Sequence, residues 1–244
     1  DRWHPHACWV KPAQLVHAWL AHAGIRFVGG CSIKHLRQAD GLWCLQDDQG
    51  HDLGCFETVV VANAMASAEL LTRQQHELGL GADLLDKLAA LQAVHGTLSQ
   101  GSYTEPIAGL PATPINGNGC FIPLRDADGT DHWFAGSTFE TDAARIADGA
   151  AQHAANMERM EQLLPMPGVP LVEALNRAPV SLWSSTRCVT HDRLPLVGPV
   201  QAAAGDGLWL CAGMGARGLS FSALCAELLV ARLGAEPLPL ETGL

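Results

Sequence analysis

The feature that most restricts the possible folds is a glycine-rich stretch between two apolar segments near the end of the chain. Residues 208–211 read LWLC, residues 213–218 read GMGARG, and residues 220–232 are largely apolar and carry charge only at Glu227 and Arg232. This order predicts a short buried strand, a tight glycine turn and a helix that is buried on nearly all sides. A strand-to-helix turn of this kind is typical of α/β sheets.

The three glycines Gly213, Gly215 and Gly218 match the pattern G-x-G-x-x-G. A dinucleotide fingerprint also needs a second strand and an acidic residue about twenty residues further on. After Arg232 only a short tail remains, and it contains Gly234, Pro237 and Pro239, so a pyrophosphate site is not predicted here. Two alternatives stay open: the amides that begin the helix, together with Arg217, attract an anion or a charge-accepting oxygen, or the turn only packs the helix against the sheet.

The rest of the chain divides by its hydrophobic pattern. The pattern predicts a helix over residues 12–24, and the continuous apolar run at Val59–Val61 suits the middle of a parallel sheet. Short apolar runs between Gly-, Pro- and Asn-rich turns predict an antiparallel region over residues 97–139. Further strands are expected at residues 25–28, 32–37, 41–46, 56–64 and 180–187, and a helix at residues 145–164 that Pro165 ends.

Composition excludes several classes of protein. No run of 18 apolar residues occurs, so no membrane partner is expected. The formal net charge of −10 argues against a broad surface that grips nucleic acid. The eight cysteines form no CxxC pair and predict reduced, buried thiols in a cytoplasmic protein. The alternation of His4, His6 and Cys8 has no fourth ligand nearby, so no metal site is predicted.

Two motifs carry a resemblance to a known family. Residues 186–200, TRCVTHDRLPLVGPV, and residues 207–241, which run from GLWLCAGMGARG to EPLPLE, resemble the C-terminal signature of the glycine oxidase/D-amino-acid oxidase family of flavoproteins. VVVANA at residues 59–64 resembles the end of a strand in that family. The resemblance implies an α/β fold with an α+β insert: a partial FAD/NAD(P)-binding sheet with helices, and a glycine-oxidase-like antiparallel substrate domain.

The resemblance also implies domain boundaries and upstream segments. Residues 1–93 would form part of the FAD-binding domain, residues 94–180 the substrate-binding domain, and residues 181–244 the C-terminal part of the FAD-binding domain. The pyrophosphate loop of the family would lie upstream of Asp1, so FAD could be absent from these 244 residues alone. In the branch of the family that modifies tRNA, a methyltransferase segment would lie further upstream.

Site residues follow from the same resemblance. The turn of Gly213, Met214, Gly215, Ala216, Arg217, Gly218 and Leu219 would lie against the electron-accepting edge of the flavin ring, and Ala62, Asn63 and Ala64 would contact the cofactor at a strand end. Arg187 would bind a substrate carboxylate with Arg217 nearby. For Arg187 two alternatives stay open, a surface role and an ion pair with Asp192, and Ala62–Ala64 could be an ordinary turn.

The chain departs from the family pattern in places. His95-Gly96-Thr97 replaces R-G-Q, Cys120 replaces a tyrosine, and Ala64 replaces a glycine. These differences put retention of the parent activity in doubt.

The function implied by the resemblance is FAD-dependent removal of a carboxymethyl group from a wobble uridine of tRNA. A small-molecule amine oxidase of the glycine or sarcosine type is the alternative, since the chain is acidic, and an inactive fragment of such an oxidase is a third. The partner would therefore be tRNA or a small carboxylated amine. A local basic patch of Arg2, Lys11, Arg26, Lys34 and Arg37 could serve tRNA.

Overall fold

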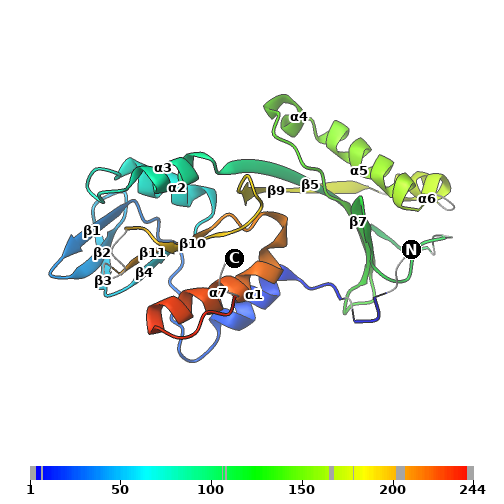
Figure 1. Cartoon of the computed structure of the whole chain (residues 1–244). Helices are drawn as coiled ribbons and strands as arrows, with labels where there is room; N and C mark the ends of the chain where they lie inside the picture. Colours follow the sequence, from blue (N-terminus) through cyan, green and yellow to red (C-terminus); the bar gives the residue numbers. More distant parts are fainter. Residues whose placement is uncertain are drawn as a thin grey trace. The chain divides into compact units, whose positions relative to one another are not determined.

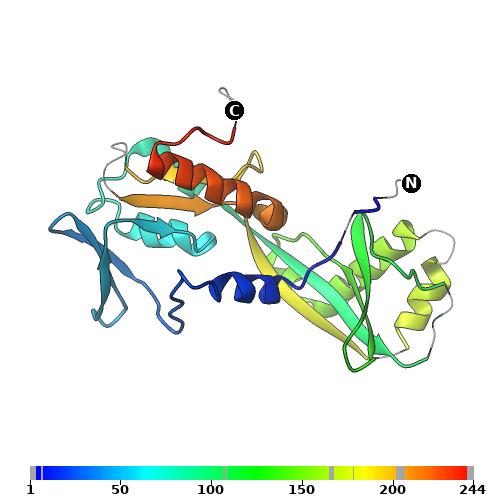
Figure 2. The same cartoon turned by 90° about the horizontal axis from the view of Figure 1, so that it is seen from below.

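The computed structural model describes residues 4–6, 8–105, 107, 109–164, 168–177, 179–201 and 207–240; Arg2, Pro165 and Glu241 of the sequence motifs lie outside this part. The chain divides into two compact units. Residues 29–94 with 187–244 form what we call the glycine-turn unit, and residues 1–28 with 95–186 form the antiparallel-sheet unit. Figures 1 and 2 show the elements of each in two views.

The glycine-turn unit is built on a three-stranded sheet of order β10-β11-β4. Strand β11 (Leu208–Ala212) is fully apolar and lies in the centre, parallel to β4 (Val59–Val61) and antiparallel to β10 (Leu196–Pro199). Helices α2 and α3 lie on one side of this sheet and α7 on the other (Figures 1 and 2). The bounds of the helices are α2 Met65–Arg73, α3 Ala82–Ala89 and α7 Gly218–Gly234, with the short 3-10 helix η1 at Gly215–Arg217.

The core of this unit forms between the sheet and the pair α2 and α3. Leu71 and Leu88 from the helices and Leu208 and Leu210 from β11 are buried in one cluster with Val61. Burial of such side chains contributes roughly 1.5–3 kcal/mol each. The strand ends are therefore held firmly in place by packing beneath them.

A second sheet in this unit is an antiparallel meander of β1 (His35–Ala39), β2 (Leu42–Gln46) and β3 (Asp52–Phe56). The β1–β2 turn uses Asp40 and Gly41, both with positive φ. The expected strand at residues 41–46 is confirmed, and the strand expected at 32–37 forms three residues later. Strand β3 was not predicted because DLGCF lacks a regular apolar alternation.

The meander corrects the prediction for the cysteines. Cys44 and Cys55 lie directly opposite each other on β2 and β3 and form a disulfide, and Cys8 and Cys31 are exposed. The expectation that the thiols are all reduced and buried is therefore wrong. Cys225 is a free, buried thiol as expected, and Cys211 is free but only partly buried. Burial, together with the nearby Cys225, raises the pKa of Cys211 to about 11, so this thiol is protonated at neutral pH.

The antiparallel-sheet unit confirms the antiparallel region predicted from the turn-rich sequence. Its sheet has the order β6-β7-β8-β5-β9, and helix α5 packs on it. Buried Phe121 and Trp133 from the sheet meet Met157 and Met160 from α5. The bounds are β5 Gln92–Tyr103, β6 Ile115–Gly117, β7 Gly119–Arg125, β8 Asp131–Gly136, β9 Val180–Val189, α1 Pro12–Leu20, α4 Ala143–Ala147, α5 Gly149–Leu163 and α6 Gly168–Leu175.

Three predictions about helices need correction. The single helix expected at residues 145–164 is two helices, because Asp148 accepts a hydrogen bond from the Ala151 amide and begins α5 anew. Helix α1 begins at Pro12 as predicted but ends at Leu20 instead of residue 24; it buries none of its residues, and Trp19 is 50% exposed. Helix α7 is only partly buried, since Val230 is 58% exposed.

Two predictions about strands also need correction. Residues 25–28 form no strand, and Phe27 among them is exposed. Strand β4 is parallel as expected, but it lies at the edge of the described sheet instead of in its middle. Within the described residues, no helix is long and apolar enough to cross a membrane.

Candidate functional site

The ends of two parallel strands bring the predicted cofactor segments to one edge of the sheet. Val61 of β4 pairs with Leu210 of β11 in parallel register. The residues that follow each strand, Ala62–Ala64 and the turn 213–219, therefore leave the sheet side by side. This edge is where open α/β sheets bind ligands.

Two of the three glycines in the turn are required by the local backbone. Gly213 has φ +79°, and a Cβ there would lie 2.7 Å from Cγ2 of Thr190. Gly215 has φ +57°, which disfavours other residues. Gly218 is different: its φ of −54° is helical, and an added Cβ would meet only Cβ of Met214, at 4.0 Å. Nothing in the described chain explains a glycine at 218, because the added Cβ would make only this ordinary contact.

Helix α7 begins at Gly218 with a first turn that is uncapped and partly exposed. It is 17 residues long, no side chain caps its beginning, and its first turn carries no acidic residue. Leu219 and Ser220 are exposed. The first amides of an α-helix have no partner within the helix and carry partial positive charge. The arrangement can therefore stabilise negative charge on an oxygen or nitrogen atom of a ligand.

Arg217 at the start of α7 has two local partners. Its Nη2 donates a hydrogen bond to the backbone oxygen of Arg193, and its guanidinium lies 4.7 Å from the ring centre of Phe221. These contacts tie the glycine turn to the loop after β9. The predicted role of Arg217 beside a substrate stays a prediction.

Arg187 lies near the end of β9 and is half-buried. Two residues further along the strand, Val189 pairs with Met214 of the glycine turn, so β9 runs beside the candidate ligand site. Partial burial lowers the pKa of the Arg187 guanidinium, which still stays protonated at neutral pH. A partly desolvated guanidinium binds a carboxylate more strongly than an exposed one does.

Asp192 has a structural role in the loop after β9. Its Oδ1 accepts a hydrogen bond from the Leu194 amide at 2.9 Å, and this bond holds the pKa of the carboxyl below its usual range. Thr190 Oγ1 donates to the Leu194 oxygen at 2.7 Å across the same loop. Asp192 therefore stabilises the turn before Pro195.

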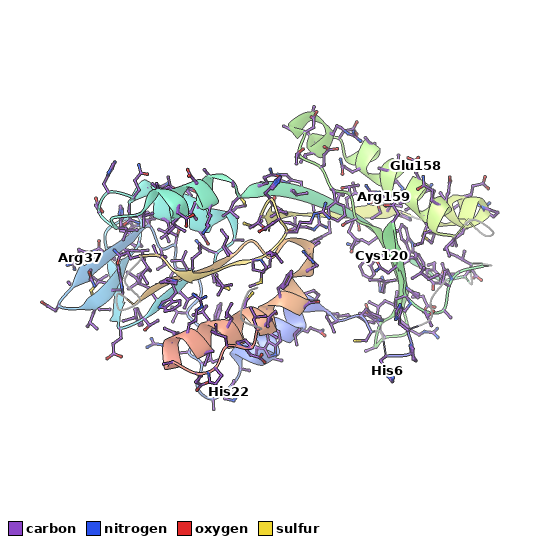
Figure 3. All side chains as sticks on the ribbon, in the orientation of Figure 1. His6, His22, Arg37, Cys120, Glu158 and Arg159 are labelled. Carbon is purple, nitrogen blue, oxygen red and sulfur yellow. A yellow bond between two sulfur atoms is a disulfide. The ribbon has the colours of Figure 1, made fainter. Side chains whose placement is uncertain are left out.

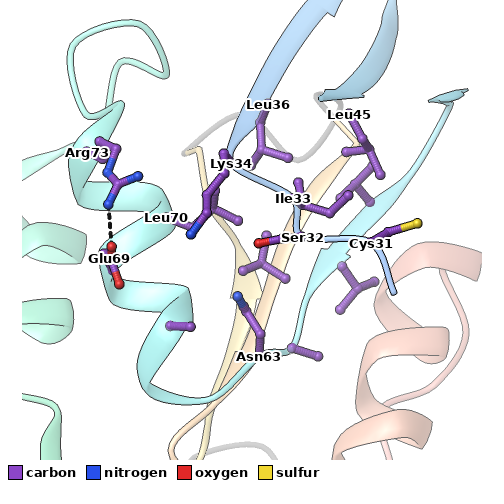
Figure 4. A pocket seen from close by; sticks show the side chains of 15 residues that line it. Cys31, Ser32, Ile33, Lys34, Leu36, Leu45, Asn63, Glu69, Leu70 and Arg73 are labelled. Atoms are coloured by element: carbon purple, nitrogen blue, oxygen red, sulfur yellow. Dashed lines mark hydrogen bonds and ion pairs between the residues drawn. The ribbon is translucent and has the colours of Figure 1, made fainter. Parts of the chain in front are cut away.

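A cavity that the sequence did not reveal lies beside the same sheet edge (Figure 4). It has a volume of about 440 Å³. Residues 31–34 and 36 form one wall, Leu70 and Arg73 of α2 form another, and Ala62 and Asn63 lie between them. Of the three predicted residues at the end of β4, Ala62 and Asn63 line the cavity and Ala64 does not. Arg73 belongs to no recognisable motif, and Lys34 was predicted only as part of a basic patch for tRNA, so no sequence signal placed either residue at a nucleotide cavity.

The chemistry of this cavity suits a nucleotide. Ile33, Leu36 and Leu45 offer apolar surface for a flat ring, and Lys34 and Arg73 supply cations. The charge of Arg73 is partly balanced by its ion pair with Glu69. Asn63 adds an amide whose Oδ1 accepts a hydrogen bond from Ser67 Oγ at 2.7 Å.

Ala64 holds a backbone conformation that favours glycine. As the residue before α2 it has φ 53° and ψ −122°, outside the regions that an L-residue prefers. Ala64→Gly should relieve this strain and raise the free energy of unfolding by about 1 kcal/mol. Urea denaturation measures the change. Ala66→Gly, two residues later within α2, is the matched control and should lower the free energy of unfolding by a similar amount. A loss of stability in both variants would contradict the strain inferred at Ala64.

The remaining departures from the family pattern lie in the antiparallel-sheet unit. Cys120 on β7, labelled in Figure 3, is half-buried, and burial raises the pKa of its thiol. His95 Nδ1 lies 2.9 Å from Thr186 Oγ1. Within the described residues no group of three or more His, Cys, Asp or Glu side chains could hold a metal ion.

Comparison with known families and curated proteins gives consistent matches. The sequence model of the FAD dependent oxidoreductase family, DAO, matches residues 2–232. The tRNA 5-methylaminomethyl-2-thiouridine biosynthesis bifunctional protein MnmC of Albidiferax ferrireducens is 42% identical over 249 residues, which cover 100% of this chain and 41% of that protein. The protein of the same name from Verminephrobacter eiseniae is 41% identical, over 98% of this chain and 40% of its own length. The chain thus spans about 40% of the length of these relatives.

Solved structures confirm the predicted fold class. Glycine oxidase from Geobacillus kaustophilus superposes with a TM-score of 0.59 at 20% identity, over 87% of this chain and 50% of that one. Iminodiacetate oxidase from Chelativorans sp. gives 0.58 at 17% identity, over 87% and 51%. At these identities the likeness establishes the fold alone.

Proposed function

The chain belongs to the DAO family of FAD-dependent oxidoreductases, and from this premise we propose that it forms part of an oxidase acting on tRNA. The reaction would remove the carboxymethyl group from 5-carboxymethylaminomethyl-(2-thio)uridine at the wobble position. The relatives of about 40% identity, named for tRNA 5-methylaminomethyl-2-thiouridine biosynthesis, support this substrate. We place the protein in the cytoplasm, with the tRNA.

The observation that carries the proposal is the uncapped, exposed beginning of α7, where a Cβ on Gly218 would contact only Cβ of Met214. The residues there fit a flavin. The amides of Gly218 and Leu219 would lie against the edge of the ring that becomes negative on reduction, and Gly213–Arg217 would shape the turn. The cavity at Asn63 would hold the nucleotide half, with Ala62 and Asn63 in its wall.

FAD, when bound, would supply the chemistry of hydride acceptance from the carbon next to the substrate nitrogen. The residues of this chain orient the substrate and stabilise the charge that develops on the reacting groups. Arg187 binds the carboxylate of the carboxymethyl group with its guanidinium fork and so fixes which C–H bond is presented. The amides of α7 stabilise negative charge that develops during the transfer. Water then hydrolyses the oxidised carbon–nitrogen bond and releases glyoxylate.

A substitution at Gly218 distinguishes two hypotheses: that the glycine turn binds a ligand, and that it only packs α7 against the sheet. Alanine is a better helix residue than glycine, so Gly218→Ala should raise stability by up to about 1 kcal/mol. If a flavin approaches these amides, the added methyl group should weaken FAD binding by about tenfold. FAD titration of the apoprotein and urea denaturation measure the two effects. Gly234→Ala at the other end of α7 is the control and should leave FAD binding unchanged; equal FAD affinity of both variants would refute the flavin assignment.

A small carboxylated amine is the second candidate substrate, favoured by the net charge of −10. We propose that the parts of the relatives beyond this chain supply the remaining FAD-binding segments and a methyltransferase. Hydrogen peroxide release and flavin reduction should be measured with tRNA that carries the carboxymethylaminomethyl group and with glycine and sarcosine. Turnover of tRNA alone supports the proposal, and turnover of the small amines alone contradicts it.

A further inference from the structure

The side chain of Gln74 links the two walls of the cavity at Asn63. Gln74 follows α2 directly and is only 4% exposed. Its Oε1 accepts a hydrogen bond from the Leu36 amide at 2.9 Å, and its Nε2 donates to the Leu70 oxygen at 3.1 Å. Nε2 also lies 3.5 Å from the oxygen of Lys34. Lys34, Leu36 and Leu70 all line the cavity.

The orientation of this amide is fixed by its partners. The Leu36 amide can only donate, so it must meet the oxygen of the Gln74 side chain. The Leu70 and Lys34 carbonyl oxygens can only accept, so they must meet the nitrogen. Each end of the side chain therefore has a single possible role, and a 180° flip of the amide would break all three hydrogen bonds.

The Gln74 side chain supplies β1 with a hydrogen-bond acceptor that a neighbouring strand would otherwise supply. Strand β1 is at the edge of its sheet, and its outward amide at Leu36 would otherwise be buried without a partner. A buried amide without a hydrogen bond is costly. The Gln74 side chain satisfies this amide and ties β1 to the end of α2, which keeps the Lys34 wall at a fixed distance from the Leu70 wall.

We propose that Gln74 is a positioning residue that sets the width of this cavity and thereby the affinity for the nucleotide half of FAD. This inference rests on the proposed function, because it takes FAD to be the ligand. Gln74 would not touch the ligand. It would act through Lys34, Leu36 and Leu70, whose backbone it holds.

Two variants test the inference in the protein expressed from its complete gene. Gln74→Met keeps the shape but removes every hydrogen bond, and should weaken FAD binding by about tenfold at every pH. Gln74→Glu keeps the acceptor for Leu36 but turns a carboxylate toward two carbonyl oxygens. Burial raises the pKa of the new carboxyl, and once protonated it can donate as the amide does. Its FAD affinity should therefore be low at alkaline pH and approach the wild-type value as the pH falls.

The measurement is a titration of apoprotein with FAD, followed by flavin fluorescence, at several pH values. Gln152 is also 4% exposed and hydrogen-bonded, but it lies in the antiparallel-sheet unit, so Gln152→Met should lower thermal stability without changing FAD affinity. If Gln74→Met binds FAD as tightly as the wild type, the inference is wrong while the proposed function stands. If the wild-type apoprotein does not bind FAD, both are wrong.

Discussion

Replacing Arg187 by alanine should lower kcat/KM for the carboxymethyl-bearing substrate roughly a hundredfold, because a partly buried guanidinium that meets a carboxylate is worth about 3 kcal/mol. Arg187 is half-buried near the end of β9. Two residues later in the strand, Val189 pairs with Met214 of the glycine turn. FAD affinity should not change, since the proposed flavin contacts come from α7 and the cavity at Asn63. Steady-state kinetics and an FAD titration measure the two quantities.

Two further variants make this prediction specific. Arg187→Lys keeps the positive charge but loses the planar fork, and should give an intermediate kcat/KM. Arg159→Ala removes another half-buried arginine, one that donates to the backbone oxygen of Ser137 in the antiparallel-sheet unit. We expect it to lower stability and leave kcat/KM within severalfold of the wild type. Unchanged kinetics in Arg187→Ala would remove the carboxylate-binding assignment.

Gly213→Ala should destabilise the glycine-turn unit by about 3 kcal/mol, the sum of a disfavoured positive φ and a close contact in a packed interior. The new Cβ would lie 2.7 Å from Cγ2 of Thr190, and Thr190 is itself held by its hydrogen bond to the Leu194 oxygen. The threonine cannot move without breaking that bond. Urea denaturation of the variant and the wild type measures the loss.

Gly215→Ala is the matched control for this prediction. Its φ of +57° is also positive, but the new Cβ would lie 3.7 Å from Cγ2 of Val189, an ordinary contact. It should therefore cost only about 1 kcal/mol, the backbone part alone. Equal losses in the two variants would show that the contact with Thr190 does not limit the position of the turn.

The sequence predicted those elements whose pattern is local. The apolar strand LWLC, the glycine turn and α7 were predicted within two residues of their observed bounds, because periodicity and glycine spacing report directly on backbone conformation. The parallel pairing of β4 was also predicted, since Val59–Val61 is apolar throughout. Because β4 and β11 are parallel neighbours, the predicted segments 62–64 and 213–219 that follow them lie at the same edge of the sheet.

The features that the sequence did not reveal depend on contacts between distant residues. The Cys44–Cys55 disulfide needs the register of β2 against β3, and β3 has no clear strand pattern. The cavity wall at Lys34 and the bond from Gln74 to Leu36 join residues 38 positions apart. The exposure of Val230 was missed because an apolar helix predicts burial without saying what covers it. Neither residue type nor spacing reports such contacts.

The central claim is that the beginning of α7 and the cavity at Asn63 hold a flavin. The most direct test is the visible absorption spectrum of the protein expressed from its complete gene, recorded before and after addition of FAD and removal of the free cofactor. We predict the absorption bands of oxidised flavin, bound in a one-to-one ratio and diminished in Gly218→Ala. A protein that stays colourless after incubation with FAD would contradict the account.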